Sequence, residues 1–218
     1  MEQYDIQSEL LKNHWNVMGT TYLSAKKKNV DDGNNDAVLE FLHEEWERIY
    51  PEFVLNPVKN EVIERFYFAQ TKGFEKEKQL NGEVTAFRVY YYLCQYFSLK
   101  IEPNVITDYN PENYPQYDIH FSDTNRLLFD LFSELWDEIN RDNESDFYSF
   151  EEFDLEEFYE TEVDLLQLFL AECWNETKAK THSTAIAILS EATAVGDDYF
   201  LDEKRILSDS EAEILNRQ

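Results

Sequence analysis

Glycine and proline are scarce in this chain, each occurring only five times in 218 residues. So few turn-forming residues argue against an all-β sandwich or barrel. With only two cysteines, Cys94 and Cys173, the chain has no disulfide framework, and we expect a reduced, cytoplasmic setting. No apolar run approaches the roughly 18 residues of a membrane helix, and the N-terminus lacks the pattern of a secretion signal.

Recognisable catalytic signatures are also missing. The sequence holds neither the G-x-S-x-G of many hydrolases nor a phosphate-binding P-loop. Glu40 and His43 form one E-x-x-H pattern, whereas a di-iron bundle needs two such patterns and further glutamates. The acidic loop that begins at Asp142 has the wrong register for an EF-hand, with Phe147 in place of glycine and Phe153 in place of glutamate. We therefore predict no enzyme activity, no metal and no cofactor.

Basic residues are few, and the charge is distributed unevenly. The chain has 46 acidic and 19 basic residues, a formal net charge of -27. Residues 1–100 carry a net charge of -4 and residues 101–218 a net charge of -23. Phosphates of nucleic acid and anionic membrane surfaces would be repelled, so we predict neither as a partner. A basic protein surface would be attracted.

Hydrophobic residues make up 43% of the chain and aromatic residues 16%, enough for a buried core. Apolar side chains recur mostly at helical spacing, which predicts an all-α fold, an irregular bundle of about seven or eight helices. The segment 83–101, rich in aromatic and β-branched residues, could instead be a strand, although it is long for one. Helices are expected over 5–28, 35–50, 57–69, 83–97, 123–139, 150–173 and 183–195, and after Ser208.

A stretch rich in proline and tyrosine, residues 102–122, interrupts this pattern. Its three prolines and the missing periodicity predict an irregular connector. We expect residues 1–218 to form a single helical domain, or else two helical lobes, 1–101 and 123–218, joined by this connector.

The segment from Asp130 to Asp164 stands out, because it contains 15 carboxylates and a single arginine. It predicts two amphipathic helices separated by a polar break, with leucine and phenylalanine inside and carboxylates outside. On the second helix, acidic residues recur every four positions, about 6 Å apart along the axis. Like charges at this spacing oppose helix formation, and a basic partner would relieve the repulsion. A face that meets only solvent is the alternative, and the sequence leaves both open.

The sequence thus indicates a non-enzymatic acidic binding protein. We interpret it as an inhibitor or immunity-type protein that covers a basic surface of a nuclease toxin or another nucleic-acid-binding protein. A helical scaffold or adaptor holding a peptide or subunit in an apolar groove is one alternative, and a carboxylate-metal enzyme is another. Nothing in the sequence predicts the oligomeric state. The candidate partner-binding residues are Asp130, Glu134, Asp137, Glu138, Asp142, Glu144, Asp146, Tyr148, Glu152, Glu156, Glu160 and Asp164.

Overall fold

The computed structural model describes residues 43–44, 46–74, 84–92, 98–103, 119–120, 155–191 and 197–215. The chain divides into two compact units, Met1–Pro57 with Asp123–Leu165, and Val58–Ser122 with Leu166–Gln218. Helices are combined with a mixed sheet, so the prediction of an all-α bundle of seven or eight helices is wrong. The expected lobes, 1–101 and 123–218, stay a prediction.

In the first unit, the end of the helix expected over 35–50 is confirmed. Residues 43, 44 and 46–50 are helical and run into a π-helical turn, Pro51–Leu55. Apolar residues at helical spacing form the buried side of this segment, as expected for an amphipathic helix. The rings of Trp46 and Tyr50 stack with their centroids 5.9 Å apart. The buried residues are Trp46, Ile49, Tyr50, Val54 and Leu55.

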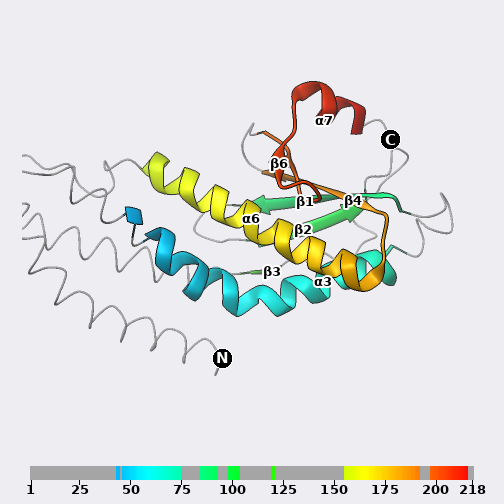
Figure 1. Ribbon diagram of the computed structural model, residues 1–218, viewed down its shortest axis with the longest axis horizontal. Coiled ribbons are helices and arrows are strands. Elements are labelled where there is room, and N and C mark those ends of the chain that lie inside the picture. Colours follow the sequence, from blue (N-terminus) through cyan, green and yellow to red (C-terminus); the bar gives the residue numbers. More distant parts are fainter. Residues whose placement is uncertain are drawn as a thin grey trace, which may run out of the picture. The chain divides into compact units, whose positions relative to one another are not determined.

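The second unit contains a six-stranded sheet with the order β3-β2-β1-β4-β5-β6 (Figure 1). Strands β1 and β4 are parallel, and every other neighbouring pair is antiparallel. The parallel pair lies in the middle of the sheet, where it is protected on both sides by other strands. The strands are β1 Ala86–Tyr92, β2 Ser98–Pro103, β3 Ile119–His120, β4 Ile186–Glu191, β5 Tyr199–Phe200 and β6 Arg205–Ile206.

The helix predicted over 83–97 is wrong, because β1 and the start of β2 lie in the segment 83–101. The end of β2 and strand β3 also lie within 102–122, so this connector is not irregular throughout, contrary to the prediction. Side chains of β1 alternate in burial: Phe87, Val89 and Tyr91 are buried, whereas Arg88 and Tyr90 are partly exposed. This period of two is typical of a strand with one face on the core. In the sequence, this alternation was overlooked because the segment 83–101 is longer than most single strands.

The helix predicted over 183–195 is also wrong, since this segment contains β4. Residues Ala187 to Ser190 are all buried, on both faces of the strand. In the sequence, a strand that is buried on both faces forms a continuous apolar run and shows no alternation of apolar and polar residues. Small and branched apolar residues in such a run fit a buried helix equally well, so the sequence pattern alone misassigned it.

Helix α3, Lys59–Thr71, confirms the helix expected over 57–69. Helix α6, Leu155–Thr181, confirms the helix expected over 150–173 for the residues that the structure describes. In the second unit they cover one face of the sheet. The Trp174 ring of α6 lies 5.8 Å from the Phe87 ring of β1 and 5.3 Å from the Phe66 ring of α3, centroid to centroid. Both contacts are close to edge-on, the arrangement that aromatic rings prefer in a core. Figure 1 shows the two helices side by side along the sheet.

The opposite face of β4 is covered by the C-terminal segment. Ile188 of β4 packs with Phe200 and Leu207, and Ala212 of helix α7, Asp209–Leu215, joins this cluster. Figure 1 accordingly shows α7 on the other side of the sheet from α6. The short helix expected after Ser208 is therefore confirmed.

Asp202, in the turn between β5 and β6, joins this turn to α6 and β4. Its Oδ2 atom accepts hydrogen bonds from Trp174 Nε1 (3.1 Å) and from the backbone N–H of Ala187 (2.9 Å). Its Oδ1 atom is paired with Lys178. The Asp202 side chain is only 12% exposed. One largely buried carboxylate thus satisfies three donors from two other elements, α6 and β4.

Ser208 and Glu211 stand at capping-box spacing at the start of helix α7. Glu211 Oε2 accepts hydrogen bonds from the backbone N–H of Ser208 (3.0 Å) and from its hydroxyl (2.7 Å). Arg205 donates to both oxygens of the same carboxylate, at 3.1 and 2.8 Å. The hydrogen bonds from Arg205, and to a smaller extent those from Ser208, lower the pKa of Glu211 to about 2.

Replacing Ser208 by alanine is expected to lower the free energy of unfolding by about 1 kcal/mol, because the Glu211 carboxylate at the start of α7 loses the hydrogen bond that the Ser208 hydroxyl donates to it. Urea denaturation followed by circular dichroism measures the change. Ser210→Ala is the matched control, since Ser210 is exposed and, among the described residues, its hydroxyl is hydrogen-bonded only to that of Ser208, at 3.3 Å. Equal losses in the two variants would show that the hydrogen bond from Ser208 to Glu211 does not stabilise α7.

Candidate functional site

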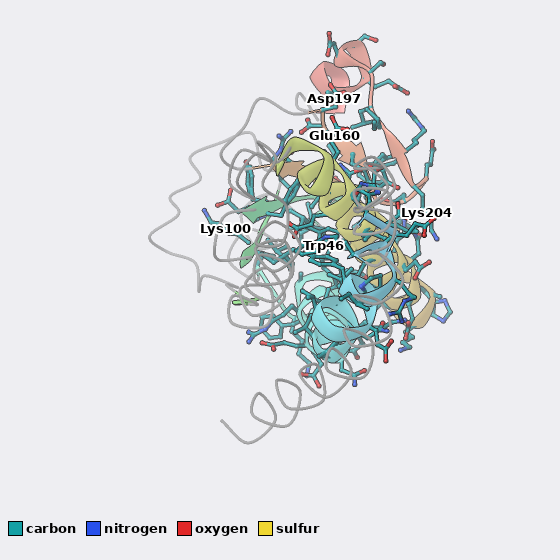
Figure 2. The ribbon with its side chains drawn as sticks, turned by 90° about the vertical axis from the view of Figure 1, so that its left-hand side faces the viewer. Trp46, Lys100, Glu160, Asp197 and Lys204 are labelled. Atoms are coloured by element: carbon teal, nitrogen blue, oxygen red, sulfur yellow. The ribbon has the colours of Figure 1, made fainter. Side chains whose placement is uncertain are left out.

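Two of the predicted partner-binding residues lie on the surface of α6, in the first unit. Glu160 and Asp164 are both exposed and stand four residues apart, one helical turn. Within the described ranges, neither side chain makes an ion pair. Figure 2 labels Glu160 on the N-terminal part of α6. The repulsion predicted between neighbouring carboxylates on this helix is therefore not relieved by a base from the described residues.

The remaining candidate residues cannot be placed in this surface. Glu156 belongs to α6, but its side chain is outside the described part of the chain. Most of the acidic stretch also lies outside the described residues, as does the break between its two expected helices. The predicted residues concerned are Asp130, Glu134, Asp137, Glu138, Asp142, Glu144, Asp146, Tyr148 and Glu152.

Glu162, between these two exposed residues, behaves differently. Its side chain keeps only partial exposure, and desolvation raises its pKa to about 8. The fully buried Tyr50 lies near enough to feel its charge: burial raises the pKa of Tyr50 well above the usual range, and Glu162 raises it further. Not every carboxylate of the stretch therefore belongs to an outer face. Sequence reasoning missed this residue, although its place two residues after Glu160 puts it on another side of the helix.

His43, the histidine of the weak E-x-x-H pattern, contacts the same part of α6. Its Nε2 atom lies 2.7 Å from the hydroxyl oxygen of Thr161, and its Nδ1 atom lies 3.9 Å from Glu47 Oε1. Both contacts fall within the first unit. The described residues include no group of three or more side chains arranged to hold a metal ion. Glu40 lies outside them.

A second cluster of polar groups, in the second unit, was not predicted. Arg88 of β1 donates through Nη1 to the Ser190 hydroxyl of β4, at 3.1 Å. Its Nη2 atom lies 3.5 Å from Oδ2 of Asp198, and Ser190 donates to Oδ1 of the same carboxylate. Arg88 and Asp198 side chains are 18% and 16% exposed. The network joins two strands to the residue that precedes β5.

Tyr90 and an ion pair between Lys100 and Glu102 continue this polar face towards β2. In the strand register, Tyr90 lies between Lys100 and Ser190, and Arg88 lies opposite Glu102. The pKa of Tyr90 is raised, chiefly by burial. Alternation within 86–92 was the signal that could have found this face, because it separates Arg88 and Tyr90 from their apolar neighbours.

Cys173 offers no reactive thiol. It is buried among the apolar residues of α6, and burial raises its pKa to about 12. The thiolate, which is the reactive form, is therefore rare at neutral pH.

No helix in the described residues has the length and apolarity needed to cross a membrane. Comparison with protein-family models, with characterised proteins and with solved structures finds no match.

Proposed function

We propose that this protein is a non-enzymatic acidic binding protein, an inhibitor or immunity-type protein that covers a basic surface of another protein. One observation carries the proposal: Glu160 and Asp164 are exposed, lie one turn apart, and have no ion-pair partner in the described residues. They belong to a stretch with 15 carboxylates and one arginine. A cationic surface would relieve repulsion that the described bases leave in place.

The bases that the structure describes next to α6 pair with carboxylates further along the helix. Glu176, further along α6, meets Lys180 at 2.8 Å and Lys59 at 3.7 Å, and Glu172 meets Lys204 at 3.6 Å. These ion pairs lie between exposed side chains and contribute little to stability. They neutralise Glu172 and Glu176, so among the exposed carboxylates that the structure describes on α6, the two without an ion pair are Glu160 and Asp164.

A nucleic-acid-binding protein, such as a nuclease, is the class of partner that fits this charge. Its substrate site is basic because it contacts phosphates. A row of carboxylates on a helix presents negative charge at a spacing of about 6 Å along the axis. The acidic surface would then compete with nucleic acid for the same basic side chains.

Reversing both exposed charges, Glu160→Lys with Asp164→Lys, is expected to slow association with the basic partner at least tenfold at low salt. Partner proteins are retained on the immobilised chain at low ionic strength, and their association rates are then measured by surface plasmon resonance. For the unchanged protein, the association rate should fall steeply as salt screens the charges.

The matched control reverses two other exposed carboxylates, Glu52→Lys with Glu64→Lys, which alters the net charge by the same amount. This control should keep most of the association rate. If both double variants lose it equally, net charge alone drives binding and the α6 surface is not the site. If neither loses it, the proposed function is wrong. Circular dichroism checks that all variants remain folded.

A further inference from the structure

We draw no further inference here: the strongest candidate, the cluster of Arg88, Ser190 and Asp198 beside Tyr90 on the polar face of the sheet, rests on hydrogen bonds within the cluster, and in the described part of the chain no bound group or unpartnered buried side chain at that place points to a ligand.

Discussion

Replacing Asp202 by alanine is expected to lower the free energy of unfolding by roughly 3–5 kcal/mol, because two buried hydrogen-bond donors lose their acceptor and a part-buried ion pair is broken. The carboxylate accepts from Trp174 Nε1 and from the N–H of Ala187, and it is paired with Lys178. In the variant, two buried donors lose their acceptor, each at about 1–3 kcal/mol. The Lys178 side chain, 23% exposed, also loses its counter-charge.

Urea denaturation followed by tryptophan fluorescence measures this loss. Asp202→Asn should lose less than the alanine variant, because the amide oxygen can still accept one of the hydrogen bonds. Glu203→Ala is the control: the neighbouring side chain is 56% exposed and, in the described part of the chain, pairs with Arg205 alone, so the change should stay within about 0.5 kcal/mol. A loss below about 1 kcal/mol for Asp202→Ala would show that the turn does not depend on this carboxylate.

Replacing Glu162 by glutamine is expected to stabilise the protein at alkaline pH, by up to about 5 kcal/mol at pH 9. In the folded chain, desolvation raises the pKa of this carboxyl from its ordinary value of 4.5 to about 8. Between these two values the folded state holds a proton that the unfolded state has released. Stability must therefore fall as the pH rises through this window, and the full penalty is present above pH 8. Glutamine carries no charge and removes the penalty.

Unfolding in urea, measured at intervals between pH 4.5 and pH 9, tests this expectation. The free energy of unfolding of the Glu162→Gln variant should exceed that of the unchanged protein by an amount that grows steadily with pH. At pH 4.5 the two should be nearly equal. Glu160→Gln is the matched control, since Glu160 lies on the same helix but is exposed. If the two glutamine variants have the same pH profile, Glu162 is not desolvated in solution.

The helices were the predictable part of the fold. Val62, Phe66 and Ala69 of α3 recur at helical spacing and are buried, and the same holds for Leu166, Leu170 and Cys173 of α6. The Ser208–Glu211 spacing likewise located the start of α7. These features depend on residues within one or two turns of each other, so the sequence states them directly.

Strands β1 and β4 were not predictable in the same way. Their pairing brings Arg88 into contact with Ser190, 102 positions later in the chain. Whether a segment such as 186–191 becomes strand or helix depends on the neighbours available to its backbone, and strand propensity follows this context closely. The polar face of the sheet was missed for this reason.

For the candidate site, the sequence predicted that Glu160 and Asp164 would lie on the outside of a helix, and the structure confirms their exposure on α6. Glu162 was not among the candidate residues, and the sequence did not predict its desolvation. Helical periodicity distinguishes the sides of a helix, but which side becomes desolvated depends on what packs against it, here the segment that contains Tyr50.

By itself, the sequence determined the strongly negative charge, its concentration after residue 100, and the amphipathic helices, because composition and local spacing express these properties without reference to distant residues. Only the tertiary structure decided that 86–92 and 186–191 are paired strands, that Asp202 satisfies three donors, and that Glu162 is desolvated. Each of these depends on groups far apart in the chain, since burial and hydrogen bonding are properties of the folded neighbourhood.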